Sequence, residues 1–203
     1  MKGLVVVLAL FAGSAAASTK DPFDGYMASI KNHQPEARLT DFAKSCGVSL
    51  DAIPVYGVST NGKWYKTTNL AKGVYNTESD YFATAAIWSA NGKARLIDFW
   101  SLSLDIGSEI NVLYCLSPSG RVRIVDVVNN TVPMAGESVG WIYKQRIVFD
   151  VNGKTINKSG HFVDALGRTV KKPKLDEDDS ASFDWIPEPS VVLDIEKALL
   201  ARH

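Results

Sequence analysis

The sequence is poor in the side chains that hold metal ions, because its 203 residues include only two cysteines and three histidines. None of them has the spacing that a structural or catalytic zinc site requires. The sequence also lacks an activated serine or cysteine motif, a phosphate-binding glycine loop and a His-Glu metalloprotease spacing. We therefore expect no metal and no cofactor, and the sequence favours a protein that is not an enzyme.

The chain also carries no net charge, because its 22 lysines and arginines balance its 22 aspartates and glutamates. Proteins that bind nucleic acid or anionic membrane surfaces usually carry a basic excess. We therefore expect neither of these as a partner.

Long apolar runs are confined to the N-terminus, where one run is too short to span a bilayer. Lys2 precedes the run "GLVVVLALFAG", and the small residues "SAAAS" follow it. This order is typical of a secretory signal peptide. We predict that residues 1–17 are a signal peptide cleaved after Ala17. Residues 18–203 would then be a single β-rich domain, secreted or periplasmic, with no membrane anchor after cleavage.

The tripeptide Asn-Gly-Lys occurs three times, at Asn61, Asn91 and Asn152. Asn-Gly between alternating apolar runs favours a type I′ hairpin turn, because both residues tolerate positive φ. Together with the turns expected at residues 117–120 and 166–167, the three Asn-Gly turns predict a mainly β fold. Its antiparallel meander of eight or nine strands would form a barrel or a strongly curved sheet. The strands are expected at residues 53–60, 63–69, 81–90, 93–104, 109–117, 120–130, 139–151, 154–164 and 168–172.

Helical segments are expected on both sides of the strands. An N-terminal helical segment at about residues 21–47 should pack on one face of the sheet, and its second helix should begin at Pro35 and end at Gly47. The polar, proline-containing tail at about residues 172–203 should be irregular until Ser190. From there the sequence fits either a short helix or a strand.

The two cysteines are predicted to form a disulfide. Cys46 lies on the apolar stripe of the second helix, and Cys115 lies in the strand "NVLYCLS". In an oxidising compartment such a pair would join the helix to the sheet, whereas two unpaired buried thiols are the alternative.

Gly62, Trp64 and Tyr65 form a Gly-x-Trp-Tyr motif. The motif resembles the opening of a lipocalin, a family of secreted eight-stranded barrels that hold small apolar ligands. The other interpretation is that Trp64 packs over Gly57 across a hairpin.

Two-residue turns would fix which side chains share a face of the sheet. The turn at Asn152 places Tyr143 opposite Phe162 and Gln145 opposite Gly160 on a core face. The turn at Asn91 places Ala85 opposite Asp98 and Ala83 opposite Trp100. Both faces of that second hairpin are largely apolar, so we expect both to be covered.

Asp98 and Asp126 are carboxylates inside apolar runs, where an ionised group must be paired, hydrogen-bonded or protonated. Each could line a pocket, or could reach an edge of the sheet, a water molecule or an arginine such as Arg95 or Arg123. Our leading hypothesis is that the protein binds a small, largely apolar ligand in an aromatic-lined hollow. The candidate ligand-binding residues are Asp98, Trp100, Tyr114, Trp141, Tyr143 and Gln145.

Two other functions stay open. The protein could be a secreted interaction module or a homodimer that buries its second apolar sheet face. It could also be a hydrolase or isomerase that uses a pocket carboxylate.

Overall fold

The structure is a computed structural model, and seven segments of the chain are described. They are residues 36–60, 63–67, 81–103, 108–131, 142–163, 168–172 and 189–200. The predicted signal peptide, the first N-terminal helix, the Asn61-Gly62 turn, the turn at 166–167 and Trp141 lie outside these segments.

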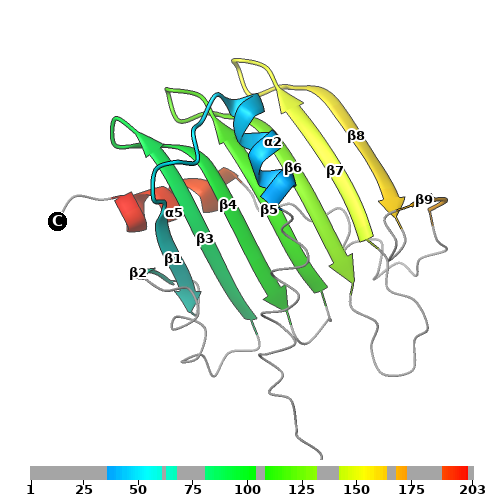
Figure 1. Ribbon diagram of the computed structural model, residues 1–203, viewed down its shortest axis with the longest axis horizontal. Coiled ribbons are helices and arrows are strands. Elements are labelled where there is room, and N and C mark those ends of the chain that lie inside the picture. Colours follow the sequence, from blue (N-terminus) through cyan, green and yellow to red (C-terminus); the bar gives the residue numbers. More distant parts are fainter. Residues whose placement is uncertain are drawn as a thin grey trace, which may run out of the picture. The chain divides into compact units, whose positions relative to one another are not determined.

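The described strands form one antiparallel sheet, shown in Figure 1. Its order is β2-β1-β3-β4-β5-β6-β7-β8-β9, so consecutive strands are neighbours except where β1 lies between β2 and β3. The predicted mainly β meander is confirmed, but the sheet is open and the barrel alternative is wrong. The strands are β1 (Val55–Thr60), β2 (Lys63–Thr67), β3 (Tyr81–Ala90), β4 (Lys93–Ser103), β5 (Ser108–Leu116), β6 (Val122–Thr131), β7 (Ile142–Phe149), β8 (Thr155–Val163) and β9 (Thr169–Val170).

The hairpin turns are of two kinds. Asn91 and Gly92 have φ angles of 55° and 74°, which is the type I′ geometry that the sequence predicts. At Asn152-Gly153 only the glycine has a positive φ, of 85°, and its N–H donates to the Asp150 carbonyl at 3.1 Å. This is a type I turn followed by a left-handed glycine, so the predicted type I′ turn is wrong there. The loop from Ser117 to Gly120 has the same form.

A β-bulge between Trp88 and Ser89 corrects the predicted register of the β3–β4 hairpin. Asp98 lies opposite Ala86 and Trp100 lies opposite Thr84, whereas the sequence placed them opposite Ala85 and Ala83. A slip of one residue moves a side chain to the other face of the sheet.

The β7–β8 hairpin keeps its predicted register over most of its length. Tyr143 pairs with Phe162, and Gln145 pairs with Gly160. The shift between Val148 and Phe149 lies beside the turn, so it leaves these pairs on the predicted face.

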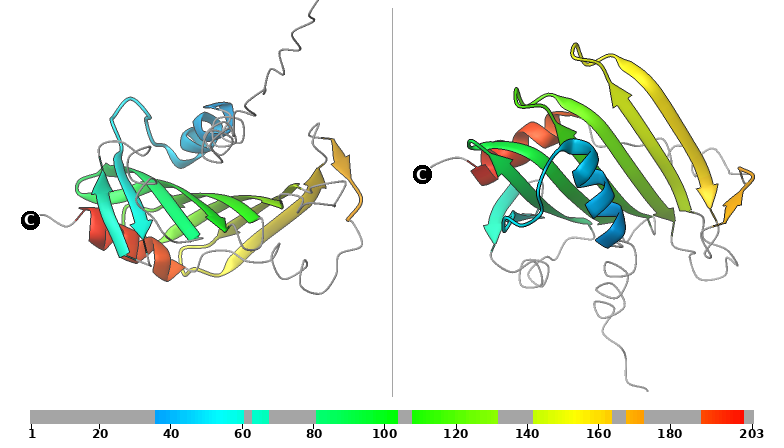
Figure 2. Two further views of the ribbon diagram at one scale, coloured as in Figure 1. Left: turned by 90° about the horizontal axis from the view of Figure 1, so that it is seen from below. Right: turned by 45° about the horizontal axis from the view of Figure 1, so that its top comes forward.

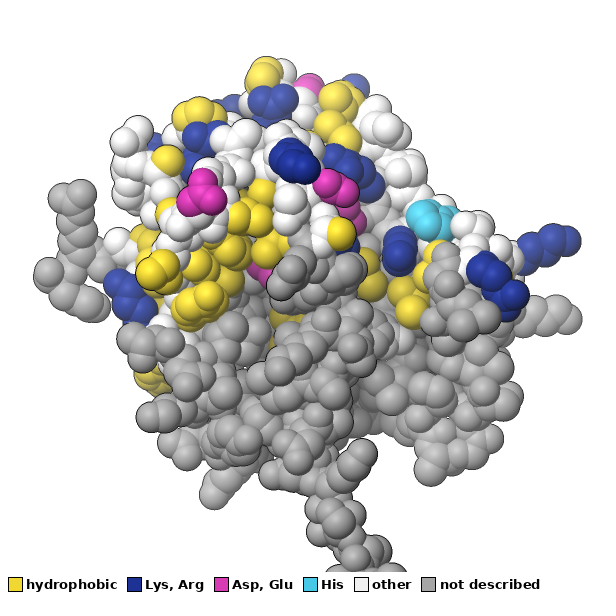
Figure 3. All heavy atoms as spheres, viewed as in Figure 1, with side chains coloured by type: hydrophobic (Ala, Val, Ile, Leu, Met, Phe, Trp, Pro, Cys, Tyr) yellow, Lys and Arg dark blue, Asp and Glu magenta, His cyan; other side chains and the backbone are white. Residues whose placement is uncertain are grey.

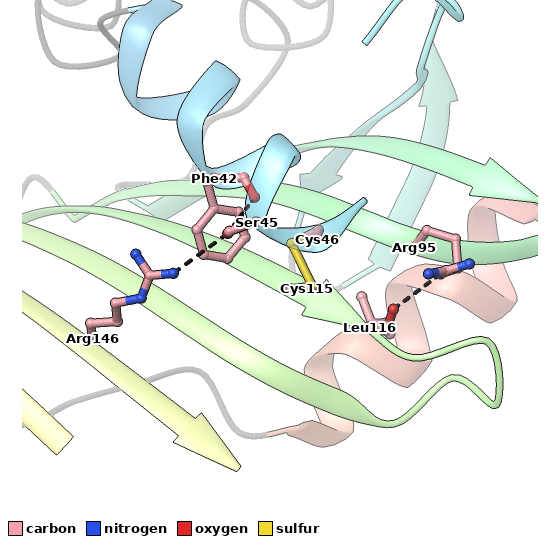
Figure 4. The surroundings of a disulfide bond; sticks show 7 residues. All are labelled: Phe42, Ser45, Cys46, Arg95, Cys115, Leu116 and Arg146. Atoms are coloured by element: carbon pink, nitrogen blue, oxygen red, sulfur yellow. Dashed lines mark hydrogen bonds between the residues drawn. A yellow bond between two sulfur atoms is a disulfide. The ribbon is translucent and has the colours of Figure 1, made fainter. Parts of the chain in front are cut away.

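Helix α2 (Glu36–Cys46) contacts one face of the sheet, here called the α2 face. Gly47, with a φ of 64°, ends the helix as predicted. The predicted disulfide between Cys46 and Cys115 is confirmed, with 5.7 Å between the two Cα atoms (Figure 4). The buried cluster around it contains Phe42, Ala43, Ala86, Trp88, Leu96, Leu113 and Cys115.

Helix α5 (Pro189–Leu200) contacts the opposite face, here called the α5 face, and the two helices lie on opposite sides of the sheet in Figure 2. The sequence allowed either a helix or a strand here, and the helix is formed. Val192, Ile195 and Leu199 are fully buried. The strand residues in their cluster include Ala85, Ile87, Ile97, Phe99, Val112, Tyr114, Val125, Val127 and Ile147.

Leu199 of α5 fills the space above Gly57 in β1. A Cβ on Gly57 would overlap the Leu199 side chain, which provides the three nearest atoms. Trp64 instead lies beside Phe99, with ring centroids 6.2 Å apart. Trp64 is therefore a packing residue of the α5 face, and the closed barrel that the lipocalin resemblance implies is not formed.

Replacing Gly153 with valine should lower the free energy of unfolding by more than about 1 kcal/mol, because a β-branched residue is strained at positive φ. A Cβ there would meet no atom within 4 Å, so the cost would come from the backbone alone. Urea unfolding measures the change. Gly153→Asn is the matched control and should lose less stability, since asparagine tolerates this conformation. An unchanged midpoint for the valine variant would contradict the turn geometry.

Replacing Gly57 with alanine should destabilise the fold through Leu199. Leu199→Ala alone removes a fully buried side chain, and such changes cost about 2–5 kcal/mol. In the Leu199→Ala background, Gly57→Ala should cost much less than in the wild type, because the new methyl group then has room. A double-mutant cycle by chemical denaturation measures this coupling, and strictly additive losses would contradict the contact.

Candidate functional site

The structure divides the residues predicted to bind a ligand between the two faces. Asp98 and Trp100 lie on the α2 face, because the bulge leaves Arg95 of β4 without a partner on β3 and shifts the register of the hairpin by one residue. Tyr114, Tyr143 and Gln145 lie on the α5 face. The described members of the set therefore do not converge on one hollow.

A buried polar network on the α2 face is centred on Arg38 of α2. Its guanidinium donates to Asn111 Oδ1, to the Asp126 backbone carbonyl at 2.8 Å and to the Asp126 carboxylate at 3.3 Å. Asn111 Nδ2 in turn donates to Asp98 Oδ1 at 2.7 Å and to the Phe99 carbonyl at 3.1 Å. The network thus joins the helix to β4, β5 and β6, and we call it the Arg38 network.

The sequence marked Asp98 and Asp126 as carboxylates that need partners, and an arginine does pair with Asp126, although it is Arg38 and not one of the two arginines named as examples. Arg95 donates instead to the Leu116 carbonyl at 3.1 Å (Figure 4). Arg38 supplies the cation to Asp126. A signal for Arg38 was present, because Arg38, Phe42 and Cys46 are spaced at i, i+4 and i+8 and share one helix face.

Burial raises the pKa of Asp98 from its ordinary value of 3.8 to about 6, while the Asn111 hydrogen bond and the Arg38 charge oppose the rise. Only 6% of Asp98 is exposed. Its Oδ1 accepts from Asn111, and the network around it reaches into α2. The arrangement attaches the helix to the sheet.

A second buried carboxylate on the α2 face was missed by the sequence reasoning. Trp100 Nε1 donates to Glu109 Oε1 at 2.9 Å, and Asn130 Nδ2 donates to Glu109 Oε2 at 3.4 Å. Glu109 is 4% exposed. The indole N–H of Trp100 is therefore used within the fold, which weakens the prediction that it contacts a ligand.

On the α5 face, Tyr143 and Gln145 form a polar pair beside an aromatic ring. Gln145 Nε2 donates to the Tyr143 hydroxyl at 3.0 Å, and the rings of Tyr143 and Phe162 have centroids 4.8 Å apart. A Cβ on Gly160 would overlap the Tyr143 hydroxyl, so the glycine makes room for the ring across β8.

Gln145 is only 3% exposed, yet its side-chain carbonyl oxygen accepts no hydrogen bond from any described residue. A buried polar atom without a partner costs about 1–3 kcal/mol. Gln145 Oε1 is thus a buried acceptor set between Val127 on β6 and Gly160 on β8.

A separate hollow of about 560 Å³ lies at the β1–β2 end of the sheet. It is largely open to solvent, since Ile53 in its wall is 89% exposed. None of the residues predicted to bind a ligand belongs to it. Its lining consists of Ile53, Pro54, Val55, Tyr56, Lys66 and Thr67.

Comparisons with protein-family models, with curated proteins and with solved structures gave no match to this chain. Within the seven described segments, no helix is long and apolar enough to cross a membrane. The same segments contain no group of three or more His, Cys, Asp or Glu side chains that could hold a metal ion.

The raised pKa of Asp98 predicts a pH-dependent stability. Between about pH 4 and pH 6 the folded protein binds more protons at this group than the unfolded chain does, so its contribution to stability is lost as the pH rises through about 6. One pKa unit corresponds to about 1.4 kcal/mol, so the loss is on the order of 3 kcal/mol.

Asp98→Asn keeps an acceptor for Asn111 and cannot ionise, so it should not show this loss. The stability of the wild type relative to Asp98→Asn should therefore fall between pH 4 and pH 7, as measured by urea unfolding at both values. A constant difference across this range would contradict the proposed ionisation behaviour.

Proposed function

We propose that the protein is a non-enzymatic binding protein of an oxidising compartment outside the cytoplasm, and that it binds a small, largely apolar ligand at Tyr143 and Gln145 on the α5 face. The observation that carries this proposal is the buried Gln145 carbonyl oxygen that no described residue satisfies. A ligand with an O–H or N–H group would remove the cost of that unpaired acceptor.

The surroundings of Gln145 support an apolar ligand body. Val127 is its neighbour on β6, and the Tyr143 and Phe162 rings lie together on the same face. A few polar groups within apolar and aromatic walls are the usual composition of a small-molecule site. The ligand class is therefore a compact apolar molecule with one hydrogen-bond donor.

Two observations support the proposal of an oxidising compartment outside the cytoplasm. The Cys46–Cys115 disulfide is of a kind that persists in oxidising surroundings, and the first seventeen residues have the pattern of a signal peptide. Among the described residues, α2 and its disulfide cover part of the α2 face.

A ligand site and a solid core make opposite predictions for Gln145→Leu. The dye N-phenyl-1-naphthylamine has an apolar body and one N–H donor, so it is a suitable fluorescent probe. If Gln145 Oε1 orients the ligand, the variant should bind the dye about tenfold more weakly. Its melting temperature should change little, because a site that accepts a ligand has room for the new side chain.

Asn157→Leu is the matched control, since it changes an exposed residue on the other face of β8. It should leave dye binding and melting temperature unchanged. A wild type that binds no dye, together with a strongly destabilised Gln145→Leu variant, would show that the amide belongs to a solid core. Native mass spectrometry of protein purified from its source should detect a bound small molecule. A dimer without a bound molecule would favour the interaction module instead.

A further inference from the structure

Among the described residues, β9 is the only strand that pairs with the outer edge of β8, and it reaches only the end of that edge. β9 pairs only with Phe162 and Val163 at the end of the strand, and every residue from 155 to 161 is exposed. Strand edges present unpaired N–H and C=O groups that another chain can pair with. This edge lies on the far side of the sheet from β1 and β2 (Figure 1).

The β7–β8 hairpin is basic although the whole chain is neutral. The carboxylate of Asp150 is used in its turn, where it accepts from the backbone N–H groups of Asn152 and Lys154 at 2.8 and 2.9 Å. Figure 3, viewed from the α2 side, shows Lys and Arg side chains near the histidine. The basic residues of the hairpin are Lys144, Arg146, Lys154 and Lys158, and Asp150 is its single acidic residue.

Lys158 lies at the middle of the exposed stretch, and its position disfavours a second copy of the chain as the occupant. Two β8 edges paired antiparallel about this centre would place Lys158 opposite itself, and directly opposed like charges are destabilising. Nucleic acids and lipid headgroups are anionic, but they lack the regular N–H and C=O groups that satisfy a strand edge.

We propose that an acidic, extended segment of a partner protein adds to the outer edge of β8 as a further strand of the sheet. Lys158 lies on the α5 face, opposite Ile147, and Ile156, which is 64% exposed, lies two residues along the same edge, at the register shift of β8. Side chains on one face of an added strand recur every second residue. The matching segment therefore carries an acidic residue beside Lys158 and an apolar residue beside Ile156, two positions along.

A short fluorescein-labelled peptide, Thr-Glu-Thr-Val-Thr-Glu-Thr, reproduces this chemistry. Fluorescence polarisation with the full chain should detect binding that weakens about tenfold in Lys158→Glu, because the variant replaces attraction by repulsion. Lys158 is exposed, so this variant should fold. Lys63→Glu, an exposed position on the β2 edge, is the matched control and should bind as the wild type does.

The same peptide with N-methyl groups on alternate residues keeps its charge but loses half of its backbone donors. It should bind far more weakly if the peptide adds as a strand, and backbone amide shifts in NMR spectra should change along β8. Equal binding of the methylated peptide would overturn the proposal and indicate a general anion-binding surface. Absence of binding at about 1 mM peptide, or an equal loss in Lys63→Glu, would overturn it as well.

Discussion

The attachment of α2 to the sheet is the constraint on which the α2 face depends. An antiparallel sheet that is apolar on both faces must be covered on both, and α2 is fixed at two points along its length. At its end, Cys46 is bonded to Cys115 across 69 residues, and closing a loop of that length contributes about 4 kcal/mol in the chain-entropy model. Two turns earlier, Arg38 reaches Asn111 and Asp126. The hydrogen bond from Asn111 and the Arg38 charge offset only part of the cost of burying Asp98, whose pKa stays raised.

The strands could be predicted closely because their signals are local. Turn residues and alternating apolar residues placed β3 at residues 81–90, as observed, and the other strand ends differ from prediction by a few residues. The helix ending at Gly47 and its disulfide followed from equally local evidence. The bulge at Arg95 could not be predicted, because no Gly or Pro marks it. That one extra residue moved Asp98 and Trp100 to the other face.

The candidate site was predictable only where the register held. Tyr143 and Gln145 share a face as predicted, because the register shift of the β7–β8 hairpin lies outside the strand pairs that they form. The partners of the buried carboxylates lie on other elements, and Arg38, which reaches Asp126, is 88 positions away in the sequence. Propensity and periodicity carry no information on such pairs. The available clue was that Arg38 and Cys46 share one helix face. A helix bonded to the sheet through Cys46 therefore places Arg38 against the same face of that sheet.

Buried polar atoms without a partner among the described residues occur on both faces, at Trp88 Nε1 on the α2 face and at Gln145 Oε1 on the α5 face. On the α2 face the carboxylates of Asp98 and Glu109 accept hydrogen bonds from neighbouring side chains, so these groups hold the structure together. On the α5 face Gln145 keeps an acceptor that no described residue uses. Its neighbour Tyr143 lies across Gly160 of β8, next to the edge where we propose strand addition. A strand added there would therefore border the same ring that contacts the proposed ligand, and any coupling between the two sites would have to act in both directions.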